Sequence, residues 1–341
     1  MAKKPNGVKT ETRRPTQADV AARVGVSRQL VGLVFSGAPG VNAETEARIR
    51  AAAKEIGYRP NFAAQSLRAD SSKYIGVVFH TDESSTQALV PALYTEAAAH
   101  GFDIMLSAIS DLRDESEAID DILGHRCDGI MVIGSHSSTT RLQKLAREIP
   151  LVSIGRRLEK VRCGCVSSKG EQGVFDATEY LIGLGHKKIA CVYAKDMLDG
   201  EFRLEGYKSA MSKYKLPTNV VTITGDFAEQ GGARAAESFL AKELPTAIVC
   251  NNDQNAFGLM HRLMQAGVKI PEDVSVVGYD DVIAGYSFLD LTTVRQDHRE
   301  MASVAVEDIV ARIRGEKYLS ETFLTSSKLV IRSSTSAPRK H

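Results

Sequence analysis

The stretch TQADVAARVGVSRQLVGLVFSG, residues 16–37, decides the fold of the N-terminal part of the chain. Thr16 is suited to cap a helix, and Asp19 lies in its first turn, where the helix dipole favours negative charge. Gly25 ends that helix, because glycine readily adopts the left-handed conformation of a helix terminus. Ser27 is then placed to cap a second helix. The stretch predicts two short helices joined by a tight turn.

The spacing within this stretch is typical of a DNA-binding helix-turn-helix, since Ala21, Gly25 and Val31 lie four and six positions apart. A plain helical hairpin shares the pattern, so these residues alone leave both readings open. The apolar positions that would face the shared core are Val20, Val24, Val31, Val34 and Phe35. A third helix is expected from Asn42, its cap, to Gly57, with Pro60 preventing its continuation.

The start of the second helix carries side chains that suit the edges of bases. Ser27, Arg28 and Gln29 would enter the major groove, where Arg pairs with guanine and Gln with adenine, each for about 1–3 kcal/mol of discrimination. Arg28 contacting a phosphate only is the alternative. Leu33, one turn later, is suited to a thymine methyl group.

Composition and charge place this head on an otherwise ordinary protein. The chain has 341 residues, 43% of them apolar and 25% charged, which suits two or three compact units. No run of about 18 apolar residues predicts a transmembrane helix. Residues 1–70 hold twelve Lys or Arg against six Asp or Glu, net +6, whereas the remainder holds 31 against 36, net −5. A basic head on an acidic body indicates a polyanionic partner.

The first 15 residues are polar and basic and lack the apolar segment of a secretory signal. They are interpreted as a disordered tail, or as an arm that contacts phosphates. Five cysteines in a chain without such a signal favour a reducing cytoplasm over a disulfide framework. Cys163 and Cys165 are read as neighbours along a strand rather than as metal ligands. The sequence predicts neither a metal site nor a cofactor.

Strands and helices alternate from Tyr74 onward, which predicts an α/β body of parallel sheets covered by helices. Expected strands cover residues 74–79, 102–109, 128–134, 150–155, 188–194, 220–227, 247–253 and 274–281. Expected helices cover residues 89–101, 115–126, 141–149, 173–185, 202–214, 231–243 and 255–267. Because no catalytic constellation or Gly-rich phosphate loop stands out, an enzyme is not predicted.

Taken together, these motifs resemble the lactose/galactose repressor (LacI/GalR) family of bacterial transcription regulators, over almost the whole chain. The motifs that carry the resemblance are DVAARVGVS, GVNAETEARIRAAAKEIGYRPN, SLR, HRCDGIMVIG, LGHKKIA, AIVCNNDQNAFGLM, IPEDVSVVGYDD and LTTVRQ. The chain departs from the family in its recognition helix, where Leu30-Val31-Gly32 stands in place of the frequent Thr-Val-Ser and Leu33 in place of Arg or Lys. A different operator preference is therefore expected.

The resemblance implies a hinge helix at residues 61–68 that folds when two copies meet in the minor groove. The matching leucine, Leu67, would wedge into the central base step and kink the duplex, and a small Ala64 lets two hinge helices pack closely. Leu67 as a plug against the body is the alternative. The expected DNA-binding residues are Thr16, Ser27, Arg28, Gln29, Leu33, Tyr58, Asn61, Ala64, Leu67 and Arg68.

The resemblance also implies a periplasmic-binding-protein-like body with an effector between two lobes. Because ligands of open α/β sheets bind beyond the carboxyl ends of strands, residues that follow the expected strands are candidates. The matching positions are Arg203, Phe227, Asn252 and Asp280, and further candidates are Arg156, Gln296 and His80. Charged side chains and an aromatic face form a set suited to a sugar. Asp280 bracing a loop and Phe227 lying in the core are the alternatives. HTDESSTQALV replaces an aromatic-rich stretch, so the effector is expected to differ from a common hexose.

The predicted organisation is a tail at residues 1–15, a helix-turn-helix domain at 16–60, a hinge helix and linker at 61–72, and an effector-binding and dimerisation domain at 73–341. Lobe 1 is assigned to about 73–166 and 294–325, and lobe 2 to about 167–293 and 326–341. The chain is expected to cross between lobes at residues 165–167, 292–295 and 324–327.

The predicted function is a cytoplasmic, homodimeric repressor of a near-palindromic operator, controlled by a small effector, most simply a sugar or sugar derivative. The effector acts as inducer or as corepressor, and a nucleobase corepressor is an alternative. A cytoplasmic sugar-binding protein is the alternative from another class. No leucine-heptad tail follows the body, which predicts a dimer rather than a tetramer.

Overall fold

The structure is a computed structural model, and it describes residues 13–36, 39–59, 71–158, 161–195, 197, 199–224, 228–318 and 322–339. The chain forms two compact units, Met1–Ser72 and Lys73–His341. Several predictions lie outside the described residues: the tail up to residue 12, the hinge residues Asn61, Ala64, Leu67 and Arg68, and Phe227.

The first unit contains the three predicted helices, α1 (Gln17–Val24), α2 (Arg28–Ser36) and α3 (Ala43–Glu55). Gly25 ends α1 with a φ of 78°. The Ser27 hydroxyl accepts the Leu30 amide at 3.1 Å, and the Asn42 side chain accepts the amide of Thr45 at 2.7 Å. The three helix ends predicted from glycine and polar caps are therefore present.

The start of α1 differs in detail from the prediction. The Asp19 carboxylate accepts from both the amide and the hydroxyl of Thr16, each at 2.7 Å. These bonds hold the pKa of Asp19 down, at about 2. Asp19 therefore stabilises the N-terminus by reaching back to the cap residue.

The head has one small hydrophobic core, formed where the three helices meet. Its fully enclosed members are Val20, Ala21, Val31, Val34, Ile49, Ala52 and Ala53. Phe35 and Tyr58 close one side, with their rings edge to face at 5.3 Å between centroids. The apolar spacing in the sequence thus identified the core correctly.

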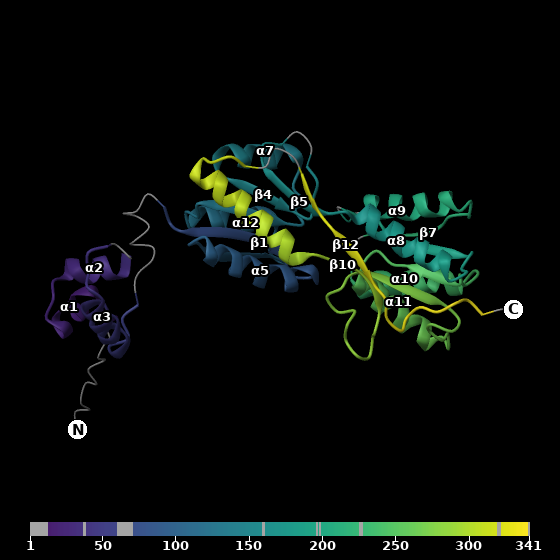
Figure 1. Ribbon diagram of the computed structural model, residues 1–341, viewed down its shortest axis with the longest axis horizontal. Coiled ribbons are helices and arrows are strands. Elements are labelled where there is room, and N and C mark those ends of the chain that lie inside the picture. Colours follow the sequence, from purple (N-terminus) through teal and green to yellow (C-terminus); the bar gives the residue numbers. More distant parts are fainter. Residues whose placement is uncertain are drawn as a thin grey trace, which may run out of the picture. The chain divides into compact units, whose positions relative to one another are not determined.

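The second unit contains two six-stranded sheets, and each sheet with its helices is called a lobe (Figure 1). The first sheet has the order β11-β5-β4-β3-β1-β2, and the second β12-β10-β9-β8-β6-β7. The first sheet comprises β1 (Tyr74–His80), β2 (Asp103–Ile109), β3 (Gly129–Ile133), β4 (Leu151–Ile154), β5 (Gly164–Ser168) and β11 (Phe323–Thr325). The second comprises β6 (Ile189–Ala194), β7 (Asn219–Ile223), β8 (Ala247–Val249), β9 (Ser275–Asp280), β10 (Thr292–Gln296) and β12 (Ser327–Val330). All pairings are parallel except β10 with β12.

Helices cover both faces of each sheet, as the alternating sequence pattern predicts. In the first lobe, α5 (Ser85–Ala99) and α12 (His298–Arg314) bury one face, and α6 (Glu115–Gly124) and α7 (Thr139–Glu148) bury the other. In the second, α10 (Glu229–Leu240) and α11 (Asp253–Gln265) lie opposite α8 (Gly170–Gly183) and α9 (Gly200–Lys213). The predicted α/β fold class is confirmed.

The chain passes between the lobes after β5, after β10 and between β11 and β12. Two predicted crossings are a few residues early. β5 stays paired with β11 as far as Ser168, and β10 belongs entirely to the second sheet, with Gln296 paired to Ser327. Residues 167–168 therefore belong to the first lobe and residues 294–296 to the second. Hydrogen bonding to a neighbouring strand sets these boundaries, and the sequence does not reveal that pairing.

The five cysteines are buried and free. Cys163 Sγ and Cys165 Sγ lie 3.8 Å apart at the start of β5. Within the described residues, no group of three or more His, Cys, Asp or Glu is arranged to hold a metal ion. In the same part of the chain, no helix is long and apolar enough to cross a membrane.

Candidate functional site

The N-terminal end of α2 is the exposed end of the head that the sequence assigns to base recognition. Ser27, Arg28 and Gln29 are all exposed there, while Leu33 is half-buried one turn later. Thr16 is exposed at the start of α1. Tyr58 is half-buried and packs against Phe35, so its ring also supports the core of the head.

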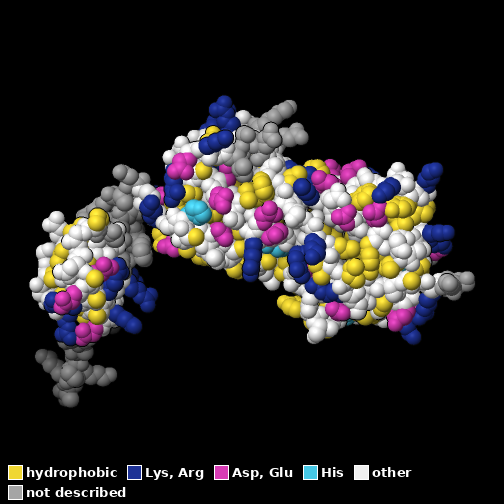
Figure 2. Space-filling model, in the orientation of Figure 1, with side chains coloured by type: hydrophobic (Ala, Val, Ile, Leu, Met, Phe, Trp, Pro, Cys, Tyr) yellow, Lys and Arg dark blue, Asp and Glu magenta, His cyan; other side chains and the backbone are white. Residues whose placement is uncertain are grey.

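Both signs of charge are visible on each unit (Figure 2). Arg23 pairs with Glu55, and Arg50 with Glu46 at 2.7 Å, so part of the positive charge of the head is neutralised locally. Arg28 belongs to none of the ion pairs found among the described residues.

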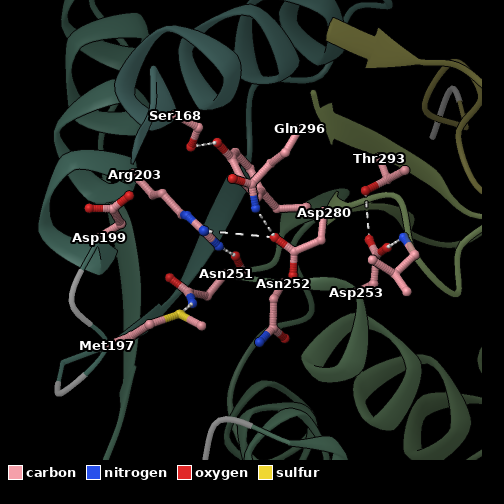
Figure 3. A network of polar contacts seen from close by, with 12 residues as sticks. Ser168, Met197, Asp199, Arg203, Asn251, Asn252, Asp253, Asp280, Thr293 and Gln296 are labelled. Atoms are coloured by element: carbon pink, nitrogen blue, oxygen red, sulfur yellow. Dashed lines mark hydrogen bonds and ion pairs between the residues drawn. The ribbon is translucent and has the colours of Figure 1, made fainter. Parts of the chain in front are cut away.

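The second unit has a cavity of about 220 Å³ lined by residues of both lobes, here called the central cavity. It brings together five of the residues predicted to bind an effector: His80, Arg203, Asn252, Asp280 and Gln296. They come from the carboxyl ends of β1, β8, β9 and β10 and from the first turn of α9. This is the edge at which ligands of open α/β sheets bind. The second-lobe side is drawn in Figure 3.

Arg203 is the only described Lys or Arg that lines the central cavity. Its guanidinium donates to the Asn251 carbonyl at 2.5 Å, lies 3.7 Å from Asp280 Oδ1, and stacks 3.7 Å from the centre of the Tyr279 ring. Figure 3 shows it pointing from α9 toward Asp280. These contacts fix a buried cation in place, and its Nε–H has no hydrogen-bond partner among the described residues.

Asp280 is buried at the end of β9 with a φ of 114°. Its Oδ1 accepts from Gln296 Nε2 at 2.7 Å. Burial raises its pKa to about 6, although the Arg203 charge opposes that rise. The neighbouring Asp281 braces the loop instead, through ion pairs with Arg295 and Arg332. Asp280 therefore lines the cavity, whereas Asp281 stabilises the loop.

Asn252 caps α11 by accepting the Asn255 amide at 2.8 Å, which fixes its side chain at the cavity wall. The next residue, Asp253, makes its hydrogen bonds within the second lobe. It accepts from the Thr293 hydroxyl at 2.6 Å and from the Val282 amide at 3.1 Å. Burial raises the pKa of Asp253 to about 7, and the nearby Asp280 adds to the rise.

Further polar residues that were not among the predicted effector contacts line the central cavity, among them Glu83, His136, Asp199 and His298. Each of these four follows a strand, namely β1, β3, β6 or β10. The strand-end rule that selected Asp280 would have found them as well. Burial and the neighbouring carboxylates Asp82 and Asp280 raise the pKa of Glu83 to about 8.

Arg156 was predicted to contact the effector, but it is not among the described residues that line the cavity. Its guanidinium donates to the carbonyl oxygens of Ser135 and Ser137. Arg156 therefore holds the loop after β3, which carries His136 to the cavity wall.

The cavity contains polar atoms that the protein itself leaves unsatisfied. In the described part of the chain, His80 Nε2, Asp199 Oδ1, Arg203 Nε and His298 Nε2 are buried without a hydrogen-bond partner. All four residues line the central cavity. Because buried polar atoms in native proteins are nearly always paired, four such atoms around one cavity indicate a polar ligand site.

Direct contacts also join the lobes around this site. Ser168 and Tyr279 share a hydrogen bond of 3.0 Å between their hydroxyls, and Gln254 donates to the Asp82 carbonyl at 3.3 Å. Arg157 pairs with Glu171 at 2.6 Å. The lobes therefore have a defined arrangement in which the cavity is assembled.

Comparison with known proteins follows the same division of the chain. Residues 16–61 match the family model "Bacterial regulatory proteins, lacI family", and residues 178–335 match "Periplasmic binding protein-like domain". The transcriptional repressor PurR of Vibrio parahaemolyticus is 32% identical, over 93% of this chain and 97% of that protein. The chain belongs to the LacI family.

Solved structures of LacI-family proteins have the same fold. A lac repressor dimer bound to operator and the anti-inducer ONPF matches with a TM-score of 0.80 and 26% identity, over 95% of this chain and all of that one. The regulator CelR in complex with cellobiose matches at 0.68 and 27%, over 94% and 100%. A LacI-family regulator from Enterococcus faecium with bound ribose matches at 0.69 and 25%, over 77% and 99%.

The protein is a DNA-binding transcriptional regulator of the LacI family with an effector-binding body, as the sequence predicted. Its relatives are regulators rather than enzymes.

Proposed function

We propose that the protein is a cytoplasmic, dimeric repressor of a near-palindromic operator, and that a monosaccharide-sized carbohydrate in the central cavity controls its affinity for DNA. The observation that carries the proposal is the set of unsatisfied atoms around that cavity, from Asp199, Arg203, His80 and His298. Donors and acceptors mixed at close range suit a ligand with several hydroxyl groups, since each hydroxyl both donates and accepts.

The size of the cavity supports a small ligand. Its volume of about 220 Å³ is below the roughly 300–1,000 Å³ of pockets that hold drug-sized molecules. Two LacI-family structures similar to this chain contain sugars, cellobiose and ribose. Ribose, the smaller of the two, is closer in size to the volume of the central cavity.

The ligand would join the two lobes, because its partners come from both. His80 and His298 belong to the first lobe, and Arg203 and Asp280 to the second. A ligand that contacts both sides binds one lobe arrangement better than another and shifts the equilibrium between them. By linkage, the same preference changes the affinity of the head for operator.

The test is a fluorescence-anisotropy titration of the protein against its own upstream DNA and a scrambled duplex, at two salt concentrations. Monosaccharides are added in turn, with guanine and hypoxanthine as a separate arm. Tight binding to the upstream DNA that a monosaccharide weakens or strengthens is expected, and the direction distinguishes inducer from corepressor. A change produced by a nucleobase alone would reject the carbohydrate.

A variant ties the effect to the cavity. Asp280→Asn keeps the shape of the side chain and its place beside Arg203 and Gln296, but removes the charge. It is expected to weaken the response to the sugar at least about tenfold, which corresponds to 1.4 kcal/mol. The exposed Glu148→Gln, at the end of α7, is the control that should respond normally.

A further inference from the structure

The central cavity is lined by more acidic than basic side chains. Asp82, Glu83, Asp199 and Asp280 face one guanidinium, that of Arg203. Arg203 is already engaged by Asp280, at 3.7 Å, and by the Asn251 carbonyl. The positive charge of Arg203 also opposes the rise in the pKa of Asp199 and of Glu83, so one cation of the cavity wall is shared among three carboxyl groups.

A neighbouring cavity is also lined by acidic side chains. A second cavity, of about 550 Å³, shares Asp82, Glu83 and Gln254 with the first and is also lined by Asp111 and Glu229. No Lys or Arg is among its described lining residues. Adjoining acidic surfaces raise the local concentration of cations and lower that of anions.

Two of the three histidines that line the cavity do not reverse this balance. Burial lowers the pKa of both His136 and His298, which favours their neutral forms. A neutral imidazole supplies one donor and one acceptor but no positive charge. His136 and His298 therefore add no positive charge at neutral pH, where Glu83, with a pKa of about 8, is also largely protonated and neutral.

The two carboxylate oxygens of Asp199 differ in their hydrogen bonding. The residue is 5% exposed, and its Oδ2 accepts from the Ser167 hydroxyl at 2.7 Å. Its Oδ1 is buried, has no partner among the described residues, and belongs to a side chain that lines the cavity. One oxygen is thus held by the protein, and the other has no donor among the described residues.

From this geometry we propose that the effector carries a protonated amine, as an amino sugar does, and that Asp199 Oδ1 accepts a charge-assisted hydrogen bond from it. The inference rests on the proposed function and specifies its ligand. An amine supplies a donor for Oδ1 and adds a second positive charge to a cavity whose wall holds one guanidinium and four carboxyl groups. A hydroxyl supplies only the donor, without a positive charge to pair with the carboxylate. Ligands with a phosphate or carboxylate are disfavoured by the same walls.

The experiment is isothermal titration calorimetry of the full chain with matched triples: D-glucosamine, D-glucose and N-acetyl-D-glucosamine, and the corresponding galactose and mannose compounds. In at least one triple, the amine is expected to bind about tenfold or more tightly than both neutral members, a difference of 1.4 kcal/mol. Its affinity should fall as pH rises through the pKa of the amine, while a neutral sugar shows no such fall.

Asp199→Asn is expected to reduce the affinity for the amine to that of the neutral sugar. Glu201→Gln is the matched control, because it removes one negative charge two residues away, from an exposed position in the first turn of α9. The control should keep the preference. Thermal unfolding of both variants checks that they fold, and the comparison within each triple on the unaltered protein needs no variant.

Three results would overturn the inference: equal binding of amine and neutral members in every triple, an undiminished preference in Asp199→Asn, or no binding by any triple. The anisotropy titration separates this failure from that of the proposed function. If a neutral sugar changes operator affinity, the carbohydrate-controlled repressor stands and only the amine is rejected. If no carbohydrate does, both are rejected.

Discussion

The hydroxyl of Ser167 donates a 2.7 Å hydrogen bond to Asp199 Oδ2, and this bond joins the two lobes beside the central cavity. Ser167 lies in β5 of the first sheet, and Asp199 immediately precedes α9 of the second lobe. Both residues are buried, and burial raises the pKa of Asp199. A contact between the lobes therefore also orients the carboxylate assigned to the ligand.

Ser167→Ala tests the contribution of this bond to stability. Without the hydroxyl, a buried carboxyl group loses a donor, which is expected to lower the free energy of unfolding by about 1–3 kcal/mol. Urea unfolding measures the change. In Asp199→Asn the same serine substitution should cost less, because no charge is left unpaired, and equal costs in both backgrounds would show that the two residues are not coupled.

Gly258→Ala is expected to destabilise the second lobe. An added Cβ would lie 1.8 Å from the Glu229 carbonyl oxygen, and at Gly232 it would lie 1.9 Å from that of Asn255. Helices α10 and α11 thus touch backbone to backbone in two places, and either substitution forces them apart at a cost of about 1–3 kcal/mol or more. Differential scanning calorimetry should show a lower Tm.

Gly183→Ala is the matched control for that prediction. Gly183 is the last residue of α8, and an added Cβ would meet nothing within 4 Å. Its stability is expected to stay within about 1 kcal/mol of the unaltered protein. Equal losses in the control and in Gly258→Ala would contradict the packing explanation.

Glu83→Gln tests the pH dependence of the cavity. Burial and nearby carboxylates raise the pKa of Glu83 from 4.5 to about 8. Between these values the folded protein holds a proton that the unfolded chain has lost, so stability falls as pH rises through the interval. Glutamine stays neutral. The Tm of Glu83→Gln relative to the unaltered protein should therefore increase from pH 5 to pH 8 and then level off, and parallel curves would contradict the assignment.

Arg28→Ala tests the head. If Arg28 reads a base, affinity for the operator should fall by about 1–3 kcal/mol, while affinity for a scrambled duplex changes little. If it contacts only a phosphate, both affinities fall together and the salt dependence becomes shallower. Anisotropy titrations at several salt concentrations distinguish the two outcomes.

The sequence was most informative where a local rule determines the structure. Gly25, Ser27 and Asn42 end or begin helices through contacts with residues at most four positions away. Such contacts can be read from a short window of sequence. The same holds for the alternation of strands and helices that gave the fold class.

The cavity could be predicted only in part. Asp280 and Arg203 were found because they stand at strand or helix ends, but Asp199 acquires its orientation from Ser167, 32 positions away. Arg156 follows a strand just as Asp280 does, yet its guanidinium binds the carbonyls of another loop. Which strand-end residue faces the cavity depends on side-chain direction, and that is set by the assembled fold.

Helix α12 has a consequence for how the protein is made. It contributes to the core of the first lobe the side chains of Met301, Ala302, Ala305, Val306, Ile309 and Val310. All strands of that lobe except β11 precede residue 169, so about 130 residues separate them from α12. At a translation rate of roughly 5–20 residues per second, the ribosome needs on the order of ten seconds to synthesise the chain between β5 and α12. During this time the apolar face of the nascent first sheet lacks the helix that covers it, while every strand of the second lobe up to β10 is synthesised. The first lobe is therefore the first to begin synthesis, but it cannot complete its core much before the second lobe. Residues 74–168 should accordingly be the segment that most needs chaperones before release from the ribosome.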